Sequence, residues 1–220
     1  MNNKLHGLFA ATLSPLKPDG TLNFEQVPGI VSHLKQSGVA GIYIAGSTGE
    51  GMSLTLDERR DSAEAFIAAA RGQLQTVVHV GHNSLTEAKS LAEHAWLAGA
   101  DVISATSPSY YGIPNVSTLV DSMAEIASAV PEAPFYYYHI PSLTRATISI
   151  PLFLKHASEK IPNLVGVKYT APHIHEYQAS LNVGDGKFDL VWGMDEMLLS
   201  ALVVGAKGAI GSTYNVAAPL

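Results

Sequence analysis

A single lysine stands near the end of an apolar segment, where a solvated cation would be unusual. Residues 163–172 read NLVGVKYTAP, with Lys168 near the end of the segment and a hydroxyl two residues later at Thr170. A lysine that is desolvated at a strand end can lose its proton, and its neutral amine can then attack a ketone to form a Schiff base. A structural ion pair would also explain such a lysine, so the segment alone leaves two alternatives.

A glycine-rich turn, GSTGEG at residues 46–51, supplies two hydroxyls, Ser47 and Thr48, together with several backbone N–H groups. Such a turn can bind an anion, either a phosphate or a carboxylate. No arginine lies beside it, which favours a carboxylate. The alternative is an ordinary glycine-rich turn that binds nothing.

Three tyrosines and a histidine follow one another in the segment FYYYHIP, residues 135–141. Side chains alternate along a strand, so Tyr136 and Tyr138 are expected on one face and Tyr137 and His139 on the other. Aromatic residues in strands usually serve packing. A tyrosine hydroxyl buried at a strand end nevertheless needs a hydrogen-bond partner, and it could relay protons.

Two adjacent carboxylates, Asp195 and Glu196, follow the apolar segment at residues 188–193. They could act as general acid and base, bind a metal ion, or accept hydrogen bonds from substrate hydroxyls. Acidic residues are also favoured at a helix N-terminus by the helix dipole, without any ligand. His173 and His175 lie at a predicted helix start, where residues two apart point in different directions, so we expect no metal site there.

A repeating order of short apolar strands and helices must position these groups. Regular alternation of strands and helices is typical of a parallel sheet. Eight such units in about 220 residues favour a TIM (β/α)8 barrel, with a doubly wound open sheet as the alternative. Catalytic groups of a barrel lie at the C-terminal ends of its strands. The eight strands are predicted at residues 7–13, 38–46, 75–81, 101–107, 134–140, 164–170, 188–193 and 206–213, each followed by a helical stretch except the last.

The predicted helices carry their own start signals. Asn23 is expected to cap the first helix. Thr55 and Glu58 have the spacing of a capping box, and so do Ser84 and Glu87. These signals place helix starts where the alternation of strands and helices requires them.

Composition excludes several classes of protein. The chain is 47% hydrophobic and 15% charged, which is typical of a globular protein of one domain. Its net charge of -6 and the lack of a basic stripe argue against a nucleic-acid-binding role. No apolar run approaches the ~18 residues of a membrane span, and the N-terminus lacks a signal-peptide pattern. There is no cysteine, which excludes disulfides and fits a cytoplasmic protein.

The motifs GSTGEG, YYYHIP and GVKYT, taken together and in this order, resemble the dihydrodipicolinate synthase and N-acetylneuraminate lyase family of class I aldolases. The resemblance implies that Lys168 is the Schiff-base lysine and that Tyr138 relays protons. It also implies that Ser47 and Thr48 hold the carboxylate of a keto acid. The polyhydroxylated part of the substrate would be held by Thr170, Gly193, Asp195, Glu196 and Ser212.

One position distinguishes the branches of this family. The dihydrodipicolinate synthase branch places an arginine two residues after the proline of the tyrosine motif, to bind a second carboxylate. Here that position is Leu143, and Arg145 is not expected to replace it. The motifs WGMDE and IGST also resemble the lyase branch. The resemblance therefore implies cleavage of N-acetylneuraminate, a sialic acid, to pyruvate and N-acetylmannosamine by a homotetramer, without metal or organic cofactor.

The sequence ends shortly after the eighth predicted strand, whereas family members continue with further helices. We expect residues 1–220 to form a single barrel domain that has all eight strands but lacks the last outer helix and the C-terminal helices. Two other functions stay open. One is another pyruvate-dependent aldolase or dehydratase of the same family, acting on a different sugar acid. The other is a non-catalytic barrel that binds a keto acid or a partner.

Overall fold

The computed structural model describes residues 4–219, in which eight parallel strands close into a barrel. The strands pair in chain order, and β1 also pairs with β8, so the sheet has no edge. The predicted TIM barrel is confirmed. The alternative of an open sheet is wrong, because its two outermost strands would stay unpaired. The strands are β1 (Gly7–Ala11), β2 (Gly41–Ile44), β3 (Gln75–His79), β4 (Val102–Thr106), β5 (Phe135–His139), β6 (Leu164–Tyr169), β7 (Asp189–Trp192) and β8 (Gly208–Gly211).

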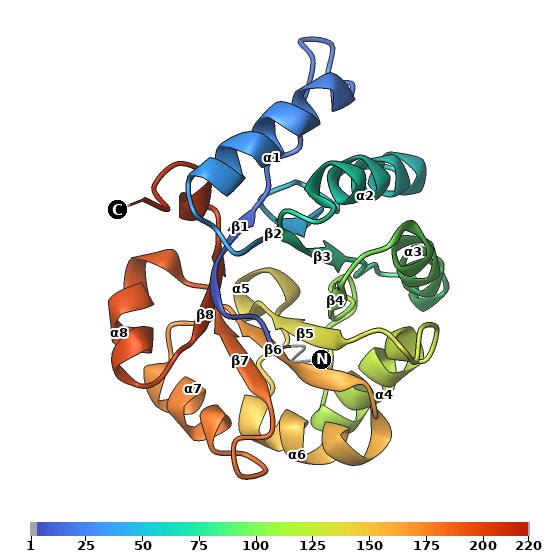
Figure 1. Ribbon diagram of the computed structural model, residues 1–220. Coiled ribbons are helices and arrows are strands. Elements are labelled where there is room, and N and C mark those ends of the chain that lie inside the picture. Colours follow the sequence, from blue (N-terminus) through green and yellow to red (C-terminus); the bar gives the residue numbers. More distant parts are fainter. Residues whose placement is uncertain (1–3, 220) are drawn as a thin grey trace.

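Helices surround the strands and follow each of β1 to β7 (Figure 1). Within the described residues, β8 is followed by a single 3-10 turn, which lies beside α1. The helices are η1 (Phe24–Gln26), α1 (Val27–Gln36), α2 (Leu56–Ala70), α3 (Leu85–Ala98), α4 (Val116–Ala127), α5 (Pro141–Thr144), α6 (Ile150–Lys160), α7 (Ile174–Leu181), η2 (Asp195–Met197), α8 (Leu198–Val203) and η3 (Thr213–Asn215).

Two of the three predicted helix caps form. Thr55 and Glu58 make a complete capping box at the start of α2, and the Ser84 hydroxyl accepts the backbone N–H of Glu87 at the start of α3. The prediction for Asn23 is wrong. It precedes η1 instead of an α-helix, and its side chain makes no capping hydrogen bond, because a 3-10 turn comes before α1.

Alternation along the strands divides the core into two clusters. One lies inside the barrel and the other lies between the strands and the helices. The predicted alternation is confirmed, and the structure decides which pair faces inward: Tyr136 and Tyr138 belong to the inner cluster, whereas Tyr137 belongs to the outer one. The inner cluster consists of Leu5, Phe9, Ala11, Tyr43, Val77, Val102, Tyr136, Tyr138, Ile140, Val191 and Ile210. Several of these side chains are aromatic, so aromatic rings make up much of the barrel interior.

Two glycines allow neighbouring strands to approach. A Cβ added at Gly166 in β6 would lie 1.8 Å from the Asp189 carbonyl oxygen in β7. A Cβ at Gly41 in β2 would lie 2.4 Å from the Gln75 carbonyl oxygen in β3. Both atoms belong to the backbone and cannot turn aside, so a side chain at either position would push adjacent strands apart.

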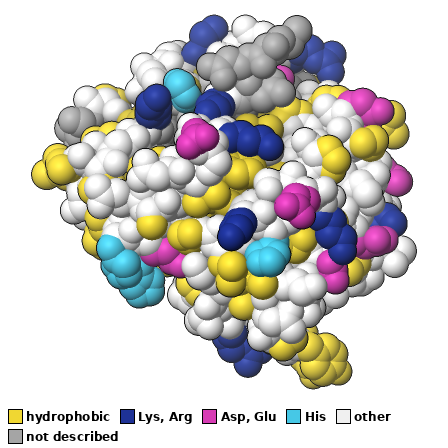
Figure 2. Space-filling view, turned by 90° about the horizontal axis from the view of Figure 1, so that it is seen from below, with side chains coloured by type: hydrophobic (Ala, Val, Ile, Leu, Met, Phe, Trp, Pro, Cys, Tyr) yellow, Lys and Arg dark blue, Asp and Glu magenta, His cyan; other side chains and the backbone are white. Residues whose placement is uncertain are grey.

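The surface mixes charges of both signs. On the face shown in Figure 2, Lys and Arg side chains are interspersed with Asp and Glu side chains. This pattern differs from the basic stripe of a nucleic-acid-binding protein. Among the described residues, no helix has both the length and the apolar character that crossing a membrane would require.

Replacing Gly166 with alanine should destabilise the barrel, since the methyl group would meet the backbone of β7. We expect the free energy of unfolding to fall by at least about 1–3 kcal/mol, the usual cost of overpacking. Gly29 in α1 is the matched control, because nothing lies within 4 Å of an added Cβ there. Gly29→Ala should raise stability by about 0.5–1 kcal/mol. Urea unfolding of both variants measures their free energies of unfolding, and equal midpoints for the two variants would contradict the prediction.

Candidate active site

Lys168 lies inside the barrel with its amine against two aromatic rings. The residue is only 4% exposed. It pairs in register with Tyr138 on the neighbouring strand β5. Its Nζ lies 3.9 Å from the centre of the Tyr138 ring and 4.2 Å from the centre of the Tyr43 ring. Among the described residues, no carboxylate lies within 4.0 Å of this nitrogen. Within the described residues, Lys168 therefore does not form the structural ion pair that was the alternative explanation for it.

The glycine-rich turn after β2 places its hydroxyls beside Tyr138. The Ser47 Oγ lies 3.4 Å from the Tyr138 hydroxyl oxygen. The turn is tight, because a Cβ at Gly51 would lie 2.0 Å from the Ala45 carbonyl oxygen. Within residues 4–219, the backbone N–H groups of Ser47 and Thr48 have no hydrogen-bond acceptor. The turn therefore offers two hydroxyls and two free N–H groups to an anion next to Tyr138.

A buried histidine connects this turn to the rest of the barrel. The Nδ1 of His79 lies 3.1 Å from the Ala45 carbonyl oxygen, and its Nε2 lies 3.3 Å from the Thr106 backbone nitrogen. A carbonyl only accepts and a backbone N–H only donates, so Nδ1 carries the proton and Nε2 accepts. On the other side, the buried Arg59 of α2 donates to the carbonyl oxygens of His79 and Gly81 at 2.8 and 2.9 Å.

Burial keeps the ionisable neighbours of Lys168 uncharged. It holds the pKa of His79 well below its ordinary value, and the positive charges of Arg59 and Lys168 lower that pKa further. The pKa of Tyr43 is well above its ordinary value, first because the phenol is buried and then because of Tyr138. Neutral rings next to Lys168 leave its nitrogen without a counter-ion.

The residues expected to hold a polyol form two contact groups. A Cβ at Gly193 would lie 2.0 Å from the Thr170 hydroxyl oxygen, which is buried and has no partner among the described residues. The Asp195 carboxylate accepts the backbone N–H of Thr213 at 2.9 Å and lies 3.5 Å from the Ser212 hydroxyl oxygen. Asp195 therefore joins the loop after β7 to the loop after β8.

The two adjacent acids have different surroundings. Asp195 is partly buried and already accepts a backbone hydrogen bond, whereas Glu196 is exposed and makes no hydrogen bond or ion pair with the described residues. The pKa of Tyr214 lies above its ordinary value, first because the phenol is buried and then because of the negative charges of Asp195 and Glu196. Residues 4–219 contain no cluster of three His, Asp or Glu side chains that could hold a metal ion.

The position that distinguishes the branches of the family is apolar and open to solvent. Leu143 in α5 is 59% exposed. Arg145 adopts a left-handed backbone with φ of 58°, and its guanidinium donates to the Ser109 carbonyl oxygen at 3.0 Å. Arg145 therefore binds the loop after β4, in agreement with the expectation that it does not replace an arginine at position 143.

Sequence reasoning did not find Tyr43, His79 or Arg59. Tyr43 and His79 lie within apolar strand segments and look like packing residues there. Arg59 carried a usable signal, since it precedes Ala63 and Phe66 on the buried face of α2 at helical spacing. An arginine on such a face needs hydrogen-bond partners inside the protein, which here are the two carbonyl groups.

His79 should matter to anion binding through the Ala45 carbonyl. In His79→Asn, the side-chain amide can still donate to that oxygen, whereas in His79→Phe it cannot. We expect His79→Phe to weaken binding of a keto acid such as pyruvate by about 2–10-fold more than His79→Asn, which corresponds to one hydrogen bond. Calorimetric titration measures the affinities, and urea unfolding measures any shared loss of stability. Equal affinities in the two variants would contradict this role.

Comparisons of this sequence with known proteins find relatives that all belong to one family. The model of the dihydrodipicolinate synthetase family matches residues 4–220. The N-acetylneuraminate lyase of Rattus norvegicus is 42% identical over 215 residues, which are 96% of this chain and 67% of the rat protein. N-acetylneuraminate lyase B of Xenopus laevis is 44% identical over 96% of this chain and 80% of its own length.

Solved structures show the same likeness in three dimensions. N-acetylneuraminate lyase from Proteus mirabilis superposes with a TM-score of 0.96 at 38% identity, over 98% of this chain and 73% of that one. The lyase from Aliivibrio salmonicida also gives 0.96, at 42% identity, over 98% and 72%. A barrel with the lysine, the tyrosine and the glycine-rich turn in these places, matched along nearly its whole length, belongs to the dihydrodipicolinate synthetase family.

Proposed function

We propose that this chain is a class I lyase that cleaves N-acetylneuraminate to pyruvate and N-acetylmannosamine through a Schiff base on Lys168. The observation that carries this proposal is the position of Lys168, which is buried, has no carboxylate partner within residues 4–219 and lies next to Tyr138. Relatives that are 40–44% identical over 96% of this chain carry the name N-acetylneuraminate lyase, which supports the same reaction.

The reaction begins with attack of the Lys168 amine on the C2 carbonyl carbon of the open-chain sugar. Loss of water gives an iminium that joins Nζ to C2. The C3–C4 bond then breaks, and its electron pair moves through C3 toward the iminium nitrogen, forming an enamine. C4 leaves as the aldehyde of N-acetylmannosamine. Protonation of C3 and hydrolysis of the iminium release pyruvate and the free lysine.

Cleavage requires the C4 hydroxyl to lose its proton. The Tyr138 hydroxyl takes this proton and passes its own to the substrate carboxylate, which supplies the proton that C3 later needs. The support for this role is that the Tyr138 ring contacts Nζ while its hydroxyl approaches Ser47. A relay at this position connects the reacting carbon atoms with the anion site.

The substrate carboxylate binds in the turn formed by residues 46–51. Ser47 and Thr48 supply hydroxyls, and their free N–H groups supply two further donors. At the other end, Thr170, Gly193, Asp195, Glu196 and Ser212 hold the polyhydroxylated tail. Asp195 and Glu196 repel the carboxylate and accept hydrogen bonds from hydroxyls, so the substrate can bind in only one direction.

Another pyruvate-dependent aldolase or dehydratase of the family is a second candidate. It is favoured by the hydrogen bond from Thr213 to Asp195, which leaves fewer free acceptors for a long polyol. Release of pyruvate from N-acetylneuraminate, compared with release from shorter sugar acids, distinguishes the two. A homotetramer and a cytoplasmic location belong to this proposal through the family resemblance, and sedimentation and cell fractionation test them.

Lys168→Ala should abolish the covalent adduct that borohydride traps with pyruvate, because no other amine occupies the place of Nζ. Lys155→Ala on the exposed side of α6 is the control and should trap pyruvate as the unmodified chain does. Mass spectrometry of the intact chain after reduction measures the adduct. An adduct of unchanged yield in the Lys168 variant would refute the Schiff base at this residue.

Asp195→Asn should impair sialic acid cleavage far more than formation of the pyruvate adduct. The asparagine oxygen can still accept the Thr213 N–H and keep the loop in place, whereas the charge that binds sugar hydroxyls is lost. We expect kcat/KM to fall by about 10–100-fold, as for one charge-assisted hydrogen bond. The same measurements on Glu196→Gln distinguish the contribution of Glu196 to cleavage from that of Asp195. An equal loss of cleavage and adduct formation would contradict a role in substrate specificity.

A further inference from the structure

A pocket lies outside the barrel, between the end of β5, the start of α6 and the start of α7. Side chains alternate, so His139 and Tyr169, which follow Tyr138 and Lys168 in the chain and pair with each other in register, point away from the barrel interior. The pocket has a volume of about 490 Å³, within the range of ~300–1,000 Å³ that is typical of small-molecule sites. Its lining consists of His139, Pro141, Thr147, Ile148, Ser149, Pro151, His173, His175, Glu176 and Ala179.

The floor of this pocket contains a buried polar atom that lacks a partner. His139 is 2% exposed, and its Nδ1 has no hydrogen-bond partner among the described residues. Burial lowers the pKa of His139 to about 4, so the ring is neutral near pH 7. A neutral imidazole has one N–H donor and one acceptor nitrogen, which suits a hydroxyl group because a hydroxyl both donates and accepts.

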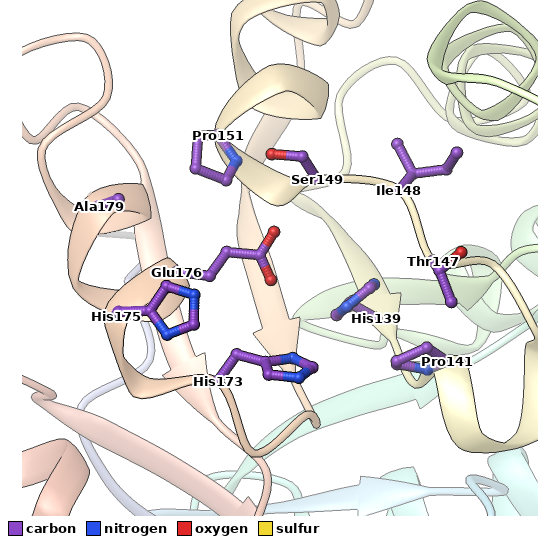
Figure 3. A pocket seen from close by; sticks show the side chains of 10 residues that line it. All are labelled: His139, Pro141, Thr147, Ile148, Ser149, Pro151, His173, His175, Glu176 and Ala179. Carbon is purple, nitrogen blue, oxygen red and sulfur yellow. The ribbon is translucent and has the colours of Figure 1, made fainter.

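A carboxylate in a fixed position faces the same space. Glu176 accepts the Tyr169 hydroxyl at 2.6 Å and the Ile150 backbone N–H at 3.1 Å. Figure 3 shows its carboxylate pointing into the space between α6 and α7, on the same side as the rings of His139 and His173. Each carboxylate oxygen has a lone pair beyond the one already used, so Glu176 can accept further hydrogen bonds from a ligand.

The rest of the lining restricts the charge of the ligand. Among the described residues, no lysine or arginine lines the pocket, and Glu176 would repel an anion. The Glu176 carboxylate already receives two donors, which weakens its attraction for a cation. Thr147 and Ser149 add hydroxyls, while the rings of Pro141 and Pro151 offer apolar surfaces. Hydroxyls, imidazoles and one carboxylate beside small apolar faces match a molecule with several hydroxyls and C–H faces.

We propose that this pocket is a second small-molecule site, which binds a neutral polyhydroxylated compound of the size of a monosaccharide. It is separate from the barrel mouth, because His139 and Tyr169 point outward where Tyr138 and Lys168 point inward. A ligand here contacts His139 of β5, the strand that carries Tyr138.

The test uses three probes that share a carbon skeleton and differ in charge, namely D-mannose, D-mannosamine and D-mannonate. Calorimetric titration of the 220-residue chain should show saturable binding of D-mannose, with a Kd on the order of millimolar or tighter. D-mannosamine and D-mannonate should bind more weakly at this site. Tighter binding of either charged probe here, or no saturable binding of D-mannose, would overturn the proposal.

Paired variants on α7 locate the site. Ala179 lines the pocket, whereas Gln178 is exposed beside it and does not. Ala179→Phe should fill the pocket and weaken D-mannose binding at least about tenfold, and Gln178→Phe should leave it unchanged. Equal binding in the two variants would place the sugar elsewhere and overturn the proposal.

A smaller change covers the case in which Ala179→Phe fails to fold. The Ser149 hydroxyl makes no capping hydrogen bond at the start of α6, so Ser149→Ala should not disturb the helix. It should weaken D-mannose binding severalfold while the unfolding midpoint stays the same. The histidine-ring NMR signals of the unmodified chain should include one, assigned by His139→Asn, that shifts with D-mannose. Unchanged affinity in Ser149→Ala, together with an unmoved His139 signal, would also refute the site.

Discussion

The Lys168 nitrogen is held inside a closed barrel against the faces of two tyrosines, and no carboxylate of the described part of the chain pairs with it. Taking a charged amine out of water is costly unless a counter-ion or hydrogen bonds compensate. The faces of Tyr43 and Tyr138 compensate only in part, through attraction between a cation and an aromatic ring. A nitrogen in this position can act as a nucleophile, since no ion pair has to be broken before it reacts.

Strand pairing fixes the distance between this nitrogen and its neighbours. Lys168 and Tyr138 are register partners on adjacent strands, and Gly166 allows β6 and β7 to approach closely. A shift of one residue in β6 would turn Lys168 outward and bring Tyr169 inside. The closed barrel prevents such a slip, because every strand is paired on both sides.

The glycine-rich turn is held by a second buried group, His79. Because this ring is neutral with its proton on Nδ1, it donates to Ala45 without placing a charge beside Lys168. Arg59 of α2 donates a hydrogen bond to the carbonyl oxygen of His79 in β3, from outside the barrel. The glycine-rich turn and the amine are thus supported separately, the turn by hydrogen bonds to its backbone and the amine by aromatic contacts. A ligand can therefore meet both in a fixed arrangement.

The sequence alone determined the eight strands, the capping box of Thr55 and Glu58, and the shared strand face of Tyr136 and Tyr138. These depend on local patterns, because alternation and capping act over a few residues. Lys168 was recognised as a candidate reactive lysine from its residue type and its place in an apolar strand.

Only the tertiary structure decided which distant groups meet. The partnership of His79 with Ala45 and the bond from Thr213 to Asp195 each join separate loops or strands, and no local pattern records them. The cap predicted at Asn23 is absent, since a 3-10 turn replaced the first turn of the helix. The physical reason is general. A hydrogen bond between segments depends on how closure of the barrel brings strand ends together, whereas a strand or a cap depends mainly on residues next to it in the chain.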